Sequence, residues 1–196
     1  MRQALDELHA LTTAVGNSFR YRVLQTETLI WLGDAENRQG NHAAGLKSLR
    51  EAQAVWQTLA AEQADDFSVK AHDHDLQKVL AESLQAQGDF DGALAALRRA
   101  MAFAEADLAA TPKDPVSIWR MADSYRRFGQ CYEAMARQAK QTNARHDAQK
   151  QACDWYQKSL QQWDEWPRVA VTSAFNTTRR ESVAQALARC ESQLNR

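Results

Sequence analysis

The chain has 196 residues, of which 44% are hydrophobic and 25% charged, a composition typical of a folded protein and not of a disordered one. Its 24 basic and 25 acidic side chains leave a formal net charge of −1, which gives no overall attraction to nucleic acid or to an anionic membrane. No apolar run approaches the roughly 20 residues that cross a bilayer. Only three prolines and seven glycines occur, which favours a few long helices over a many-stranded β fold.

The sequence aligns with itself at one fixed offset, the interval from Gly40 to Gly88, hereafter the repeat offset. The capping residues Ser18, Asp66 and Asp114 follow one another at this same interval. Self-similarity at a fixed period of this length is typical of helical repeat proteins. Such arrays usually bind partners along a surface and carry out no chemistry in a pocket.

Residues 1–16 match the second half of a repeat. Ala4 aligns with Ala52 and Leu8 with Trp56, again at the repeat offset. We therefore predict that this segment is the C-terminal half of a helix from a preceding repeat. It follows that we expect the sequence to be part of a longer protein.

Residues 17–65 and 66–113 each predict an antiparallel pair of helices. In the second pair, Asp66 can cap the first helix and Gly88 can end it in the left-handed conformation. Asp89 then caps the second helix directly, so the turn is tight. The first pair has the same helix start and stop signals: Ser18 can cap its first helix, Gly40 can end that helix, and Asn41 can cap the second.

Residues 114–166 predict a third helix pair that contains an insertion. Asp114 caps its first helix, and Pro115 occupies the first helical position, where its missing N–H costs nothing. Matching to the earlier repeats is interrupted at residues 137–148, a stretch rich in basic side chains. We interpret the insertion as a longer helix with a solvated basic tip; a contact with a partner is the alternative.

Residues 167–196 predict a loop and a last helix that starts at Asn176 or Thr178. Thr178 and Glu181 have the spacing of a capping box. The apolar side chains of this helix fall on one face, namely Val183, Ala186, Leu187 and Cys190. We expect that face to cover the exposed end of the array, as a terminal cap must.

Small residues recur at fixed positions in the predicted helices. Gly33, Ala81 and Gly129 share one position in the first helices, and Ala52 and Ala100 share one in the second helices. Large apolar residues occupy neighbouring positions. Alternation of small and large side chains allows successive helix pairs to interlock at core density.

These small-residue positions resemble those of the tetratricopeptide repeat family over residues 18–165. The resemblance implies an all-α fold, a right-handed α-solenoid of about three hairpins with a partial N-terminal helix and a C-terminal capping helix. Two features differ from the family. The period, measured from Gly40 to Gly88, exceeds the family's roughly 34 residues, so the helices are longer by about two turns. Glu36 and Gln77 also stand where the family usually has an aromatic and a large apolar residue.

The stretch DWYQKSLQQWDEWPR, after repeats of this length, resembles the C-terminal tetratricopeptide region of bacterial serine/threonine protein kinases. This resemblance implies a larger bacterial signalling protein whose kinase domain lies upstream. The 196 residues themselves contain no Gly-rich phosphate loop, HRD-type catalytic loop or DFG segment. We therefore expect no enzyme activity from this region.

In tetratricopeptide arrays the first helix of each pair lines a concave groove, and the resemblance carries those groove positions onto this chain. The candidate peptide-binding residues are Glu27, Asp34, Asn37, Asp75, Lys78, Glu82, Gln85, Asp123, Arg126, Arg127, Gln130 and Glu133. Acidic residues outnumber basic ones among them. We predict a protein-interaction module whose groove holds a peptide or protein partner with a basic or mixed-charge segment.

Several alternatives to that function stay open. Asp75–Lys78 and Asp123–Arg126 have the spacing of ordinary i, i+3 pairs on a solvated helix. The array could also close around a small ligand or peptide effector, or it could associate with itself as a homo-oligomer. A stand-alone enzyme would need a convergent polar site, which the sequence does not contain.

The histidines and cysteines predict no metal, cofactor or catalytic site. His72 and His74 are two residues apart and point away from each other on a helix, so we expect surface side chains that share no ion. Cys131, Cys153 and Cys190 are odd in number and far apart, so we predict reduced thiols and a cytoplasmic protein. Cys131 in particular is expected to be packed and unreactive.

Overall fold

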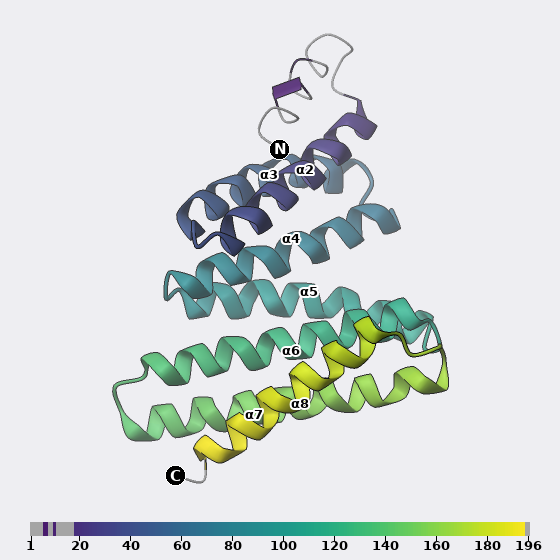
Figure 1. Cartoon of the computed structure of the whole chain (residues 1–196). Coiled ribbons are helices and arrows are strands. Elements are labelled where there is room, and N and C mark those ends of the chain that lie inside the picture. The colour runs from purple at the N-terminus through teal and green to yellow at the C-terminus, as the bar shows by residue number, and fades with distance from the viewer. Residues whose placement is uncertain (1–5, 8–9, 11–17, 195–196) are drawn as a thin grey trace. The chain divides into compact units, whose positions relative to one another are not determined.

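The computed structural model describes residues 6, 7, 10 and 18–194. Over residues 18–194 the chain forms seven α-helices and one 3-10 turn and contains no strand (Figure 1). The helices are α2 (Phe19–Arg38), α3 (His42–Glu62), α4 (Phe67–Ala86), α5 (Phe90–Ala110), α6 (Pro115–Gln138), α7 (Thr142–Glu165) and α8 (Ala174–Leu194), with the 3-10 turn η1 (Trp166–Arg168) before α8. The predicted all-α class is confirmed for these residues. The prediction for residues 1–16 lies outside the described residues apart from 6, 7 and 10.

The three predicted capping residues begin the first helix of each pair. The side chain of Ser18 accepts a hydrogen bond from the Tyr21 backbone N–H at 3.5 Å, and that of Asp66 accepts one from Val69 at 3.1 Å. Asp114 does the same for the Val116 N–H at 3.3 Å, and Pro115 follows it. Each cap satisfies one of the N–H groups that a helix start leaves without a partner.

The two predicted glycine turns are also present. Gly40 has a φ of 79° and Gly88 a φ of 80°, the left-handed conformation that glycine adopts without a steric penalty. After Gly88, Asp89 accepts a hydrogen bond from the Gly92 N–H at 3.0 Å, as a capping residue does. Asn41 differs, because it precedes α3 but makes no capping bond; its amide instead donates to Glu36 at 3.2 Å.

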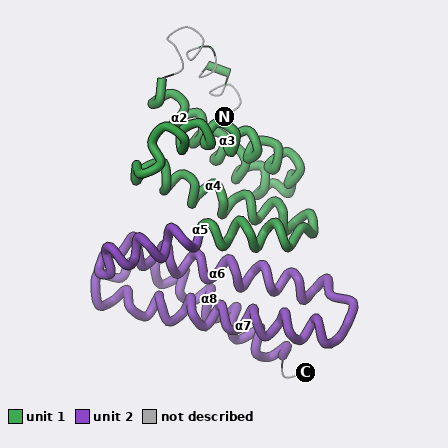
Figure 2. Tube along the Cα trace, turned by 180° about the vertical axis from the view of Figure 1, so that it is seen from behind, with its two compact units in different colours: residues 1–100 green, residues 101–196 purple. Residues whose placement is uncertain are grey.

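The chain divides into two compact units, residues 1–100 and 101–196 (Figure 2). The division falls inside α5 and therefore inside the predicted repeat 66–113. Within the first unit, α2 packs on α3 and both pack on α4. Its core consists of Leu29, Ile30, Leu46, Leu49, Ala52, Leu76, Val79 and Leu80.

The second unit is built on the antiparallel pair α6 and α7, with α8 packed on α7 (Figure 1). Tyr156 of α7 lies in the core at 1% exposure, and Ser159 donates a hydrogen bond to the carbonyl oxygen of Ala122 in α6 at 2.8 Å. Residues 137–148, the predicted insertion, belong mainly to the end of α6 and the start of α7. Both helices have 24 residues, compared with 20 and 21 for α2 and α3. Longer helices thus take up the insertion.

The last helix begins earlier than predicted. Ser173 and Asn176 cap it reciprocally: the Asn176 side chain accepts from the Ser173 N–H at 3.1 Å, and the Ser173 hydroxyl accepts from the Asn176 N–H at 3.3 Å. Asn176 is therefore inside α8, and the predicted start at Asn176 or Thr178 is wrong. Val183, Leu187 and Cys190 are buried on one face, as predicted.

The prediction of three reduced cysteines is wrong for two of them. Cys153 of α7 and Cys190 of α8 form a disulfide with their Cα atoms 5.6 Å apart. They are 37 residues apart in sequence and meet because α8 folds back onto α7. Cys131 is free and buried, as expected.

Candidate interaction surface

The first helices of two successive repeats, α2 and α4, lie against each other within residues 1–100. Nε2 of His72 on α4 lies 2.8 Å from Oε1 of Glu27 on α2. Deeper in the contact, the Asn37 amide donates to the carbonyl oxygen of Val79 at 3.3 Å and accepts from the Ser83 hydroxyl at 2.8 Å. These bonds fix the register of α2 against α4.

Four of the predicted groove residues in this unit are carboxylates, and they differ in exposure. The side chain of Asp75 is 59% exposed and that of Glu27 is 43% exposed. Asp34 and Glu82 are partly buried. Glu27 and Asp34 on α2 align with Asp75 and Glu82 on α4 at the repeat offset, so adjacent helices carry the same pattern of negative charge.

The other predicted groove residues of this unit contribute little polar surface. Asn37 is only 4% exposed, and its amide is engaged by the internal bonds to α4, so it is a packing residue. Lys78 is also buried, with its Nζ 2.9 Å from Asp75. Gln85 is half-buried. Asp34 pairs with Arg38 of its own helix at 2.5 Å.

In the second unit the predicted residues mostly bind one another. Asp123 is buried and accepts from both Arg126 at 2.6 Å and Arg127 at 3.0 Å. Glu133 accepts from the Tyr156 hydroxyl at 2.7 Å, and burial together with this bond raises the pKa of Tyr156. Gln130 is exposed. The simple i, i+3 pairing left open by the sequence is therefore present at Asp75–Lys78 and at Asp123–Arg126.

One expected surface residue is buried. His74 of α4 is 1% exposed, because α4 is covered on several sides within its unit, and the prediction of a surface side chain is wrong for it. His72 is half-buried against Glu27. A single polar residue in a helix gives no sequence signal for such burial.

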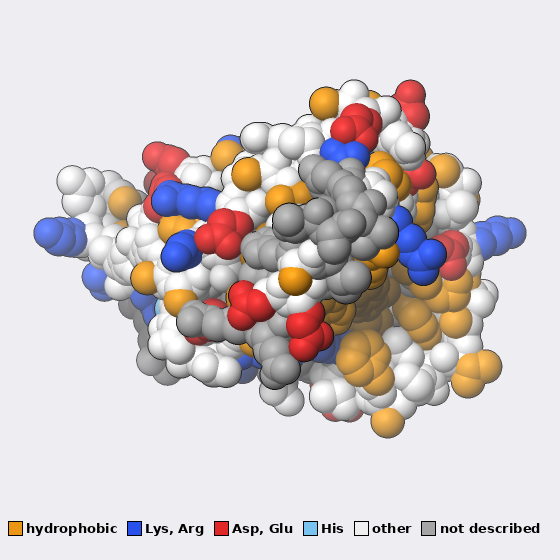
Figure 3. All heavy atoms as spheres, turned by 90° about the horizontal axis from the view of Figure 1, so that it is seen from above, with side chains coloured by type: hydrophobic (Ala, Val, Ile, Leu, Met, Phe, Trp, Pro, Cys, Tyr) orange, Lys and Arg blue, Asp and Glu red, His pale blue; other side chains and the backbone are white. Residues whose placement is uncertain are grey.

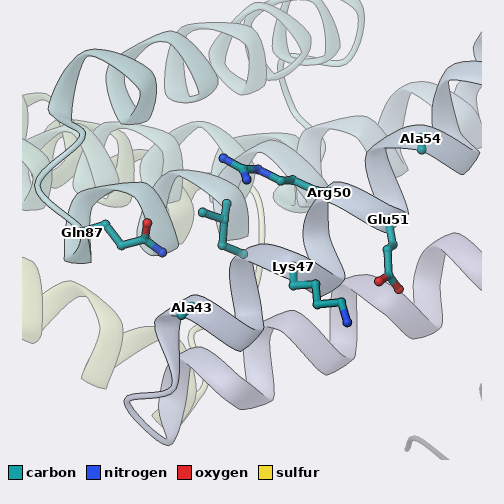
Figure 4. A pocket seen from close by; sticks show the side chains of 7 residues that line it. Ala43, Lys47, Arg50, Glu51, Ala54 and Gln87 are labelled. Carbon is teal, nitrogen blue, oxygen red and sulfur yellow. The ribbon is translucent and has the colours of Figure 1, made fainter.

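The sequence patterns do not predict an open recess that lies over the exposed face of α3. It has a volume of about 460 Å³ and lies between Leu46, Arg50 and Gln87. Figure 4 shows the side chains of Arg50 and Gln87 extending toward each other from α3 and from the end of α4, while Lys47 points elsewhere. Arg50 forms no hydrogen bond or ion pair with a residue that the structure describes. The small side chains Ala43 and Ala54 on the same face were the available sequence signal.

A second missed feature is an exposed apolar patch on α2. Trp31 is 63% exposed and Leu24 is 40% exposed. In Figure 3, hydrophobic side chains of the described residues gather in the lower right of the view, and acidic and basic side chains are scattered over the rest of the face.

No protein-family model matches this sequence, and no curated protein matches it either. Among the described helices, none has a segment long and apolar enough to cross a membrane. In residues 6, 7, 10 and 18–194, no three His, Cys, Asp or Glu side chains are grouped so that they could hold a metal ion.

Proposed function

We propose that the chain is a helical-repeat interaction module that binds a basic segment of a protein partner along α2 and α4. The observation that carries this proposal is the pattern of four carboxylates at repeat-related positions on these two adjacent helices: Glu27, Asp34, Asp75 and Glu82. Two of them, Glu27 and Asp75, are well exposed. Carboxylates spaced along neighbouring helices suit a peptide with several cations along its length.

The proposed architecture is a right-handed solenoid of the tetratricopeptide type. The recurrence of capping residues, glycine turns and small packing residues at one interval supports it. Gly33 lies against Leu49 in the first repeat, and Gly129 lies against Tyr156 in the third, so that small positions meet large ones in both. The proposed setting is a cytoplasmic bacterial signalling protein, on the basis of the sequence resemblance to kinase tails.

Charge reversal at the two carboxylates of this surface that lie on α4 tests the function. We expect Asp75→Lys combined with Glu82→Lys to weaken binding of a basic twelve-residue peptide roughly tenfold, because attraction becomes repulsion at two positions. The measurement is fluorescence anisotropy with three labelled peptides of equal length, one basic, one neutral and one acidic. The unaltered protein should bind the basic peptide in preference to the other two.

A matched control is Asp91→Lys, which reverses an exposed carboxylate on α5 outside this surface. Circular dichroism establishes that all variants retain the helical fold. Equal binding of basic and acidic peptides would contradict the proposal. So would an Asp91→Lys variant that loses as much affinity as the Asp75→Lys, Glu82→Lys protein.

A further inference from the structure

One face of α2 carries a stripe of four side chains that the described structure leaves partly uncovered: Tyr21, Leu24, Thr28 and Trp31, hereafter the α2 stripe. Trp31 and Leu24 are exposed, and Tyr21 and Thr28 are half-buried. Spacings of three, four and three residues place these side chains along a single face of the helix. Exposed tryptophan and leucine about two turns apart on one helix face are typical of a contact surface.

The repeat indicates that this face is built to be covered. At the repeat offset, Thr28 and Trp31 of α2 correspond to Leu76 and Val79 of α4. Leu76 is fully buried and Val79 is 7% exposed, and both belong to the core formed by α2, α3 and α4. The same face therefore packs against other helices in α4, whereas in α2 no described helix covers it to that extent.

We propose that the α2 stripe binds the α2 stripe of a second copy of this chain, with the two helices antiparallel about a twofold axis. The stripe has the symmetry that such a contact requires, since its spacings of three, four and three residues are the same in either direction along the helix. In a twofold interface each contact occurs twice, so a self-complementary stripe is needed. The inference goes beyond the proposed peptide site and does not rest on it, but such a dimer would cover Glu27 and Asp34, the part of that site on α2.

The side chains are complementary in size in this register. Tyr21 faces Trp31 of the second copy, and Leu24 faces Thr28 of the second copy, with both contacts repeated by symmetry. Two aromatic pairs thus flank a centre in which a large side chain meets a small one. This alternation is the knobs-into-holes packing of antiparallel helix pairs.

Charges at the two ends of one edge of the stripe are complementary as well. The same register brings Arg20 beside Asp34 of the second copy, on both sides of the axis. Arg20 is exposed and forms no ion pair with any described residue, while Asp34 has one partner, Arg38, on its own helix. At the axis, Glu27 lies near Glu27 of the second copy, a contact between like charges that opposes the dimer, although each carboxylate keeps its contact with His72 at 2.8 Å.

The oligomeric state tests this inference. Light scattering coupled to size exclusion should give about twice the chain mass of 22.1 kDa at micromolar concentration. Leu24→Glu should return the mass to that of one chain, because it places a carboxylate in the apolar centre of the contact. The matched control is Val171→Glu, which introduces the same charge at an exposed apolar residue in the other unit.

A charge exchange makes the test specific to this register. Arg20→Glu alone should weaken the dimer at least fivefold, and adding Asp34→Arg should restore it, because the ion pairs re-form with reversed sign. Both side chains reach the surface, so this pair remains informative if Leu24→Glu misfolds. A chain mass of 22.1 kDa at all concentrations would overturn the inference. A dimer that survives Leu24→Glu, or an Asp34→Arg that fails to rescue, would also overturn it.

Discussion

Gly129 lies against the ring of Tyr156, and this contact explains why no side chain larger than a hydrogen atom fits there. A Cβ at this position would be 2.7 Å from two ring carbons of Tyr156. The ring is rigid and buried, and its hydroxyl is held by Glu133 at 2.7 Å. The contact leaves little room for Tyr156 to move without loss of the hydrogen bond.

Gly129→Ala should therefore destabilise the protein, although alanine favours a helix. The steric cost of overpacking is about 1–3 kcal/mol and the gain in helix propensity is about 1 kcal/mol, so we expect a net loss of about 1–2 kcal/mol. Urea unfolding followed by circular dichroism measures it. The control is Gly129→Ala in a Tyr156→Leu background, which removes the ring carbons that the added Cβ would meet. Equal losses in both backgrounds would contradict the steric explanation.

At the scale of the helix, local signals predict most boundaries and tertiary contacts determine the rest. Ser18, Asp66 and Asp114 begin helices as predicted because a cap depends only on the next three residues. The start of α8 is also set by a local contact, because Ser173 and Asn176 cap each other reciprocally, but asparagine replaces the glutamate or glutamine usual at that position of a capping box, so the signal is weak. The Cys153–Cys190 pairing has no local signal, since it depends on how α8 packs against α7.

The disulfide ties α8 to α7, and a thiol count measures it. Native protein should show no reactive thiol at pH 7.5, since Cys131 is buried and burial raises its pKa to about 11. Denaturant alone should expose one thiol per chain, and denaturant with a phosphine reductant should expose three. A Cys153→Ala, Cys190→Ala variant should show one thiol with or without the reductant. Three thiols in denaturant alone would contradict the disulfide.

Loss of this bond should also cost stability. Closure of a 37-residue loop stabilises the folded state by about 3–4 kcal/mol through the entropy of the unfolded chain. Removal of the bond should therefore weaken the contact of Val183 and Leu187 with α7 first, because these residues form most of the buried face of α8. Hydrogen exchange of α8 locates the effect. Unchanged exchange after reduction would show that packing alone holds the helix.

At the scale of the molecule, the sequence predicts the candidate groove only in part. The groove positions implied by the family resemblance include the carboxylates Glu27 and Asp75, which reach the surface on adjacent helices. The same reasoning chose Asn37, which is buried by the contact of α2 with α4. A repeat pattern gives the face on which a residue lies, but its exposure depends on how closely the neighbouring helix approaches.

Among the carboxyl, thiol and phenol groups with shifted pKa values, the lowered values lie in the first unit and the raised values in the second. The pKa of the Arg22 guanidinium in the first unit is raised by its hydrogen bond to Glu62. In the first unit, the hydrogen bond from Arg22 lowers the pKa of Glu62, and the hydrogen bond from the Ser68 hydroxyl lowers the pKa of Asp66. In the second unit, burial raises the pKa of Cys131 from 9.0 to about 11 and also raises the pKa of Tyr156. The two units should therefore respond to opposite extremes of pH.

A carboxylate whose pKa is lower in the folded protein than in the unfolded chain stabilises the folded state at a pH above its unfolded pKa. For Glu62 and Asp66 this stabilisation is lost as the pH falls below about 4. Raised pKa values contribute stability below the unfolded pKa, and this stability is lost as the pH rises, here from about 9 upward. For Cys131 the loss amounts to about 2–3 kcal/mol by pH 11. Acid should destabilise residues 1–100 first, and alkali should destabilise residues 101–196 first.

Fluorine NMR of fluorotryptophan-labelled protein separates the two responses, because Trp56 reports on the first unit and Trp163 on the second. In urea titrations at pH 3.5, 7 and 10.5, the Trp56 midpoint should fall most at acid pH and the Trp163 midpoint most at alkaline pH. Cys131→Ala should shift the alkaline loss of stability to a pH above 10.0, the ordinary pKa at which Tyr156 ionises in the unfolded chain. Parallel shifts of both midpoints at every pH would mean that the ionisable groups act on the fold as a whole and not through the unit that contains them.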